Sequence, residues 1–153
     1  MAEVPIGAAL RRRRRDAGLS QRQLALMSGV PQPNIAAYES GRRTPAAETQ
    51  DRLDRALRVP TLERLHAERE TIIRAAQRRR LSDVRVFGSV ARGQATTGSD
   101  VDLLVHPGPD ASLFDLAGFM AEVQEALGIE VDVVSDRGSG PVMDRIRAEA
   151  VTL

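Results

Sequence analysis

The chain of 153 residues contains no cysteine and no lysine, and aromatic residues make up only 3% of it. Without cysteine there is no disulfide, no thiolate zinc site and no cysteine nucleophile, which fits a reducing compartment. The scarcity of aromatic residues argues against nucleic-acid binding by base stacking. No apolar run is long enough to span a membrane, and arginines interrupt the N-terminus where a signal peptide would need an apolar core. We therefore expect a cytoplasmic protein with no membrane association.

Charge is divided unevenly along the chain, although the formal net charge is only +1. Residues 1–80 hold 17 arginines and 9 acidic residues, a net charge of +8, whereas residues 81–153 hold 5 arginines and 12 acidic residues, a net charge of −7. This asymmetry indicates two modules with different partners. The basic half suits nucleic acid, and the acidic half suits a metal ion or a basic protein.

Two aspartates open the second of two apolar runs in the acidic half. The first run, residues 84–87, ends at Gly88 and Ser89, and the second begins around Asp100 and Asp102. Side chains alternate between the faces of a strand, so both carboxylates point the same way and repel each other unless a cation such as Mg²⁺ lies between them. Gly88 lets a ligand approach the backbone closely, and Ser89 offers a hydroxyl and backbone N–H groups to phosphate oxygens. The pattern favours metal-assisted attack on a nucleoside triphosphate.

The same residues carry a family resemblance. Gly88-Ser89, then Ala-Arg-Gly at 91–93, then Ser-Asp-x-Asp-Leu at 99–103, resemble the motif of small nucleotidyltransferases with the DNA polymerase beta fold, most closely the minimal (MNT) group. The resemblance covers roughly the second half of the chain. It implies a third carboxylate on a later strand, supplied by Asp132 between valines. It also implies a metal triad of Asp100, Asp102 and Asp132 that holds two Mg²⁺ ions, with Gly88 and Ser89 on the triphosphate of ATP.

Three nearby residues have two interpretations each. Arg92 either contacts phosphate or fixes the loop by pairing with an aspartate. Ser99 either contacts phosphate or caps the turn, and the turn is favoured. His106 is either an auxiliary group beside the nucleotide or an ordinary residue at the end of a strand.

An Asp-x-Asp pair alone is usually a solvated strand end. The Gly-Ser pair upstream and Asp132 downstream favour the functional interpretation of Asp100 and Asp102.

The basic half predicts three short helices at residues 6–17, 21–27 and 32–39. Ser20 is a good N-cap for the second helix, and Gly29 makes the tight turn that joins the second and third helices. These residues, with Ile35 and Gly41, resemble the Cro/C1 (Xre) family of helix-turn-helix DNA-binding domains over residues 6–58. The run of arginines at 11–15 is either a solvated face or a set of phosphate contacts, and the resemblance favours phosphate.

In such a domain the start of the third helix contacts base edges in the major groove. That places Gln32, Asn34 and Ala37 on the bases, and Gln21, Arg42 and Arg43 on phosphates. Prolines flank Gln32, and the neighbouring alanines are short, so DNA binding is favoured over any particular sequence specificity. A helical module that docks on protein is the alternative.

The predicted fold class is α+β: an N-terminal all-α helix-turn-helix domain at residues 1–59, a connecting helix at 60–80, and a small mixed-sheet nucleotidyltransferase domain at 81–153. A Thr44-Pro45 pair predicts the start of a fourth helix. The apolar stripe over residues 61–80 predicts one long helix. Further helices are expected at 113–127 and 142–150.

MNT proteins are typically antitoxins paired with a HEPN-domain RNase toxin. The resemblance therefore implies Mg²⁺-dependent transfer of AMP from ATP to a toxin tyrosine, with Asp132 assisting deprotonation of the attacking hydroxyl. It also implies operator binding that represses the operon, as a homodimer and as a hetero-oligomer with the toxin. The alternatives are a non-catalytic antitoxin that neutralises by stoichiometric binding, and nucleotidylation of a small molecule such as an aminoglycoside, which the missing acceptor domain disfavours.

Overall fold

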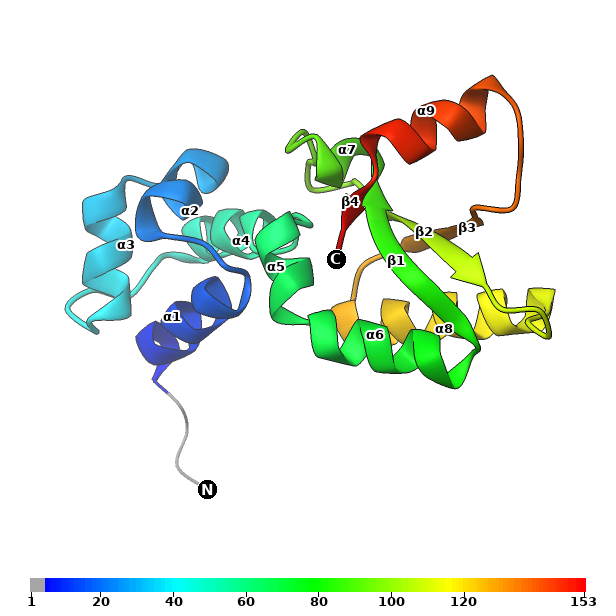
Figure 1. The fold of residues 1–153 in the computed structure, drawn as a ribbon. Coiled ribbons are helices and arrows are strands. Elements are labelled where there is room, and N and C mark those ends of the chain that lie inside the picture. The colour runs from blue at the N-terminus through cyan, green and yellow to red at the C-terminus, as the bar shows by residue number, and fades with distance from the viewer. Residues whose placement is uncertain (1–4) are drawn as a thin grey trace. The chain divides into compact units, whose positions relative to one another are not determined.

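The structure, a computed structural model, describes residues 5–153 of the chain. It divides into two compact units, Met1–Val59 and Pro60–Leu153, which are described separately (Figure 1). Each unit has a hydrophobic core of its own. Among the described residues no helix has the length and apolar content needed to cross a membrane.

The described residues of the first unit form four helices, α1 (Ile6–Asp16), α2 (Gln21–Ser28), α3 (Gln32–Glu39) and α4 (Ala47–Ala56). The three predicted helices are confirmed. Ser20 forms the expected cap of α2: its hydroxyl accepts from the backbone N–H of Gln23, whose side chain accepts from the Ser20 N–H. Gly29 ends α2 in the left-handed conformation at φ +67°, which glycine adopts without strain. The core of this unit is made by Leu10, Ala17, Leu19, Leu24, Val30, Ile35, Tyr38, Leu53, Ala56 and Leu57.

The start of the fourth helix differs from the prediction. The Thr44-Pro45 pair was expected to begin it, but α4 begins at Ala47, and no side chain caps its N-terminus. Thr44 is exposed and lies outside the helix. The pattern of a threonine before a proline is compatible with a helix start but does not require one, because both residues are also common in turns.

The second unit is built on a four-stranded mixed sheet, which confirms the α+β class. Its helices are α5 (Leu62–Ala67), α6 (Arg69–Arg78), α7 (Gly88–Ala91), α8 (Leu113–Leu127) and α9 (Pro141–Glu149). Its strands are β1 (Leu81–Phe87), β2 (Val101–Pro107), β3 (Val131–Ser135) and β4 (Val151–Thr152). The strands lie in the order β3-β2-β1-β4, with β2 and β3 parallel and both other pairings antiparallel.

The two faces of this sheet have different surroundings. Val101, Leu103 and Val105 of β2 are fully buried in the main core with residues of α6 and α8 (Figure 1). The alternate residues of β2 face the other side, where Leu104 packs with Met143 of α9. Asp102 precedes Leu104 by two residues, so it lies on the side of the sheet that α9 covers only in part.

The segment over residues 60–80 contains two helices where one was expected. The backbone at Glu68 leaves the helical conformation, with φ −93° and ψ 8°, and separates α5 from α6. The predicted apolar stripe is nevertheless buried, because Leu65, Ile72 and Ala76 all belong to the core of the second unit. The short edge strand β4, which pairs with β1, had no counterpart in the prediction.

Candidate active site

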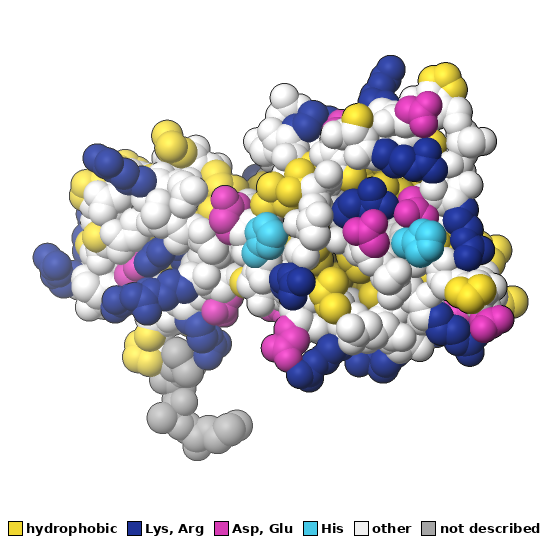
Figure 2. Space-filling model, in the orientation of Figure 1, with side chains coloured by type: hydrophobic (Ala, Val, Ile, Leu, Met, Phe, Trp, Pro, Cys, Tyr) yellow, Lys and Arg dark blue, Asp and Glu magenta, His cyan; other side chains and the backbone are white. Residues whose placement is uncertain are grey.

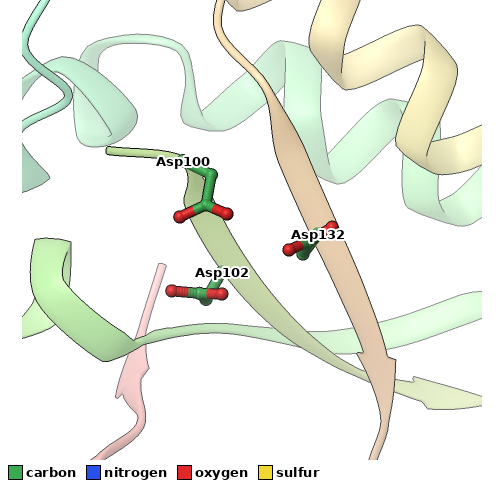
Figure 3. Close-up of side chains that lie close together, drawn as sticks. All are labelled: Asp100, Asp102 and Asp132. Atoms are coloured by element: carbon green, nitrogen blue, oxygen red, sulfur yellow. The ribbon is translucent and has the colours of Figure 1, made fainter. Parts of the chain in front are cut away.

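Three carboxylates converge where β2 and β3 begin. Asp102 and Asp132 are register partners on these two parallel strands, and Asp100 immediately precedes β2. Figure 3 shows the three side chains pointing toward one another. One oxygen from each lies within 4.8 Å of the other two. The structure therefore brings together the three aspartates that the sequence predicted.

The three neighbouring carboxylates of this acidic triad (Asp100, Asp102 and Asp132) form a negatively charged site that favours a cation. Burial, together with the charges of Asp100 and Asp132, raises the pKa of Asp102 above its ordinary value. Burial and the two neighbouring carboxylates both disfavour the negative charge of Asp102, and a bound cation would offset both effects. Carboxylate oxygens are the ligands that Mg²⁺ prefers, so the donor set fits this ion.

Gly88 joins β1 to α7 directly against the triad. Its φ is +70°, which only glycine adopts readily. A Cβ atom added at Gly88 would lie 2.2 Å from Asp102 Oδ2, closer than any side chain can approach. Glycine is required here for two independent reasons, its backbone angle and the space that the Asp102 carboxylate needs. The next residue, Ser89, is half-buried, and its hydroxyl makes no hydrogen bond within residues 5–153.

Arg92 pairs with a carboxylate, although not with an aspartate. Its Nη1 atom lies 2.9 Å from Glu149 Oε2, and Glu149 Oε1 accepts a hydrogen bond of 3.1 Å from the Gly88 N–H. Glu149, at the end of α9, was missed by the sequence analysis. It lies 61 residues from Gly88 in the chain, and no local pattern joins the two.

The two other residues with open interpretations occupy structural positions. Ser99 Oγ accepts from the Thr96 N–H at 2.8 Å, and the Ser99 N–H donates to the Thr96 carbonyl, so Ser99 closes a turn as favoured. His106 lies at the far end of β2 from the triad, where its Nδ1 contacts Asp136 at 2.9 Å. The structure does not bring His106 to the acidic triad.

Two of the candidate DNA-binding residues, Gln21 and Gln32, are joined by hydrogen bonds. Gln32 Nε2 donates to Gln21 Oε1 at 2.9 Å, and Gln21 Nε2 donates to Glu39 at 2.9 Å. Glu39 is in turn held by two hydrogen bonds from Arg14, at 2.6 and 3.0 Å. The chain of contacts fixes the side chain at the start of α3 to the core of the unit.

Of the remaining candidates, Asn34 lies in the first turn of α3, and Arg42 and Arg43 follow its C-terminal end. Arg43 Nη1 donates to Asn34 Oδ1 at 3.3 Å, and Arg42 Nε donates to Ser40 Oγ at 3.2 Å. Both arginines are exposed, and Ala37 is half-buried beside them. Dark blue arginine side chains also gather over α1 in Figure 2.

The arginine run at 11–15 is not uniform. Arg14 is buried, with its side chain 10% exposed in the ion pair with Glu39, whereas Arg11, Arg12 and Arg15 are exposed. The interpretation of the run as a solvated or phosphate-binding face is wrong for Arg14. The i, i+4 spacing of Leu10 and Arg14 places both on the buried face of α1, and that spacing was visible in the sequence.

A triad of carboxylates on one side of a mixed sheet, beside Gly88, has the donor set that metal-assisted chemistry on phosphate groups requires. Residues 69–151 match the family described as a nucleotidyltransferase domain, which covers more than half of the chain. The chain therefore belongs to the nucleotidyltransferase domain family. Residues 5–67 match the family described as a helix-turn-helix domain, so the two domains are fused in one chain.

Individual proteins are similar to the second half. Protein MJ0435 of Methanocaldococcus jannaschii, named as a candidate protein adenylyltransferase, is 45% identical over 67 residues, which are 43% of this chain and 72% of that protein. A solved structure described as a candidate minimal nucleotidyltransferase is 41% identical with a TM-score of 0.56, over 61% of this chain and 96% of that one. A solved toxin–antitoxin structure with AMP-PNP is 21% identical with a TM-score of 0.48, over 54% of this chain and 69% of that one.

Substitution of Gly88 by alanine tests the close approach to Asp102. The new methyl group would displace the Asp102 carboxylate and strain the backbone at φ +70°. Because a misplacement of about 1 Å can cost about 100-fold in rate, we expect Gly88→Ala to lower nucleotidyl transfer by about that factor. The matched control is Gly98→Ala, because a Cβ at Gly98 meets no atom within 4 Å. Equal rates for Gly88→Ala and Gly98→Ala would contradict the close-packed geometry.

Proposed function

We propose that this chain is an antitoxin that neutralises a HEPN-type RNase toxin by transferring AMP from ATP to a tyrosine of the toxin, and that its helix-turn-helix unit represses the operon. The observation that carries the enzymatic part is the convergence of Asp100, Asp102 and Asp132 within 4.8 Å beside Gly88. The family name of residues 69–151 and the adenylyltransferase name of the relative from Methanocaldococcus support the same reaction class.

The proposal gives each residue of the site a role. Asp100 and Asp102 would hold Mg²⁺, of which two ions are expected, and Asp132 would join one of them. When bound, such ions neutralise phosphate charge and stabilise the attacking and leaving oxygens of an in-line displacement. Asp132, which is exposed, would take the proton of the attacking hydroxyl. A bond forms between that oxygen and the α-phosphate, the bond to the β-phosphate breaks, and pyrophosphate leaves. Gly88, Ser89 and Arg92 would bind the triphosphate.

The antitoxin assignment rests on the pairing of an Xre-type module with an MNT-type module in one chain, as the two motifs indicate. We also propose a toxin partner whose tyrosine accepts AMP, ATP as the donor, and a cytoplasmic location. The rival within this proposal is an antitoxin that acts only by binding its toxin, and the experiment below separates the two.

The test is neutralisation of the neighbouring gene's product in cells that express both proteins. The double variant Asp100→Ala/Asp102→Ala should lose protection, whereas the control Asp110→Ala/Asp144→Ala, which removes two exposed carboxylates outside the triad, should keep it. Unchanged protection by the triad variant would refute neutralisation by catalysis. Full protection together with a stable toxin complex would establish the binding antitoxin instead.

Operator binding yields a separate prediction. Gln32 begins α3 and its side chain donates to Gln21, and in this proposal Gln32 pairs with an adenine edge. We expect Gln32→Ala to weaken binding to the operon's own promoter by about 1–3 kcal/mol and to leave random DNA unaffected. Arg43→Ala should weaken both and reduce the salt dependence by about one unit of slope. Fluorescence anisotropy at several salt concentrations measures both effects. Equal binding of wild type to promoter and random DNA would overturn the specific-repressor proposal.

A further inference from the structure

Glu149 accepts hydrogen bonds from two donors after β1 that are suited to bind an anion. Each of its carboxylate oxygens accepts from a different donor: Oε1 from the Gly88 N–H at 3.1 Å, and Oε2 from Arg92 Nη1 at 2.9 Å. Gly88 begins α7, and Glu149 ends α9, so one side chain joins the loop after β1 to the C-terminal helix. The Glu149 side chain is 26% exposed, and that of Arg92 is 47% exposed.

In the proposed function, the Gly88 N–H and the Arg92 guanidinium are the donors that bind the triphosphate. A backbone N–H beside the acidic triad and a neighbouring guanidinium form a pair of donors for two oxygens of one anionic group. In this structure the two oxygens that accept from these donors are those of the Glu149 carboxylate. Its negative charge also acts on Asp102, as do those of Asp100 and Asp132. A phosphate that reached Gly88 and Arg92 would meet a fourth carboxylate already seated there.

We propose that Glu149 is a competing carboxylate, which holds the phosphate-binding donors of the free protein and is displaced by the incoming triphosphate. The inference rests on the proposed nucleotidyl-transfer function and adds a residue that sets nucleotide affinity. The exchange leaves no donor unpaired, because a phosphate oxygen replaces each carboxylate oxygen at Gly88 and Arg92. The partly buried Gly88 N–H has an acceptor before and after this exchange.

The end of α9 is built in a way that permits this release. Glu149 is the last helical residue, and Ala150 after it is extended. The following strand β4 is an edge strand that pairs, among the described residues, with Arg85 and Val86 of β1. The glutamate side chain has three rotatable bonds, so it can leave Gly88 by rotamer change while α9 stays on the sheet. Release therefore breaks the partly exposed ion pair with Arg92 and the hydrogen bond from the Gly88 N–H. The free-energy cost is small compared with the binding of a charged ligand.

The experiment measures binding of ATP with Mg²⁺ to the full chain by isothermal titration calorimetry. The variant Glu149→Gln keeps a carbonyl oxygen for the Gly88 N–H and removes the charge. We expect it to bind ATP about fivefold more tightly than wild type, the effect of removing a partly exposed competing charge. The control Asp144→Asn removes an exposed carboxylate from the same helix, and we expect wild-type affinity for it. Inorganic tripolyphosphate should show the same order, because the competition concerns phosphate alone.

The outcomes separate the inference from the function on which it rests. Tighter binding by Glu149→Gln, with Asp144→Asn unchanged, supports displacement. Binding by wild type together with equal or weaker binding by Glu149→Gln overturns it and leaves the proposed function standing, with Glu149 then a strut that positions Arg92. Absence of ATP binding in all three proteins overturns both. Thermal unfolding of each variant verifies its fold, and Glu149→Asp, which keeps the charge but shortens the reach, provides a second variant with expected intermediate affinity.

Discussion

Substitution of Asp102 by asparagine is expected to abolish nucleotidyl transfer and to make the metal-free protein more stable. One oxygen of Asp102 lies within 4.8 Å of an oxygen of Asp100 and of Asp132, and burial together with both carboxylates raises the pKa of Asp102. Loss of a carboxylate that holds the metal should lower the rate by at least about 1000-fold, or about 4 kcal/mol in the barrier. The same change removes charge repulsion, so the melting temperature without metal should rise by a few degrees.

The opposite directions of these two effects make the prediction specific. A residue that only supported the fold would lose stability and activity together. Addition of Mg²⁺ should raise the melting temperature of wild type, because a ligand of the folded state stabilises it, and should have little effect on Asp102→Asn. The control Asp110→Asn, an exposed carboxylate in a turn, should change neither property. Full activity of Asp102→Asn, or a fall in its metal-free melting temperature, would contradict a metal site at the triad.

Substitution of Arg14 by alanine is expected to destabilise the helix-turn-helix unit by about 3 kcal/mol, because it leaves the Glu39 carboxylate buried without its partner. The side chains of Arg14 and Glu39 are 10% and 4% exposed, and Arg14 also donates to the Leu19 carbonyl at 2.6 Å. The control is Arg13→Ala, whose ion pair with Asp54 is partly exposed, and we expect a loss of less than about 1 kcal/mol.

The chain offers a probe for this measurement. Tyr38 is its single tyrosine, it is buried in the core of the first unit, and the chain has no tryptophan. Tyrosine fluorescence during urea denaturation of the full chain therefore follows the helix-turn-helix unit alone. Equal losses for Arg14→Ala and Arg13→Ala would contradict the assignment of Arg14 as a structural residue.

The same ion pair predicts a pH dependence. Burial acts to raise the pKa of Glu39, but hydrogen bonds from Arg14 and Gln21 with the charge of Arg14 outweigh it, and the pKa is lowered overall. A carboxyl whose pKa is lower in the folded state contributes stability that is present above its unfolded pKa of about 4.3 and is lost as the pH falls through the folded value. The tyrosine-monitored stability should therefore decline on acidification below about pH 4.3, and less so in Glu39→Gln.

Strand periodicity made much of the site predictable. Alternation alone places Asp100 and Asp102 on one side of β2, and the family resemblance supplies Asp132, which the structure puts in register with Asp102. The helix-turn-helix core was also predictable, since Leu24, Ile35 and Tyr38 follow helical spacing between capping residues and glycines. These features depend on local patterns, which a sequence displays directly.

Features that depend on distant contacts were not predictable in the same way. The pairing of Glu149 with Gly88 and Arg92 joins the last helix to the first loop of the domain, over 61 and 57 residues. The partner of Arg14 lies 25 residues away, on another helix, so the sequence did not show that Arg14 is paired inside the unit and not on a phosphate-binding face. The interruption between α5 and α6 at Glu68 involves neither proline nor glycine, so the sequence does not indicate it.

The most direct test of the central claim is the intact mass of the neighbouring gene's product after incubation with this chain, ATP and Mg²⁺. The account predicts a gain of one or more AMP units, absent when Asp100→Ala/Asp102→Ala replaces the wild-type chain. An unchanged mass, with a stable complex of the two proteins still formed, would contradict nucleotidyl transfer to that partner and leave binding as the means of neutralisation.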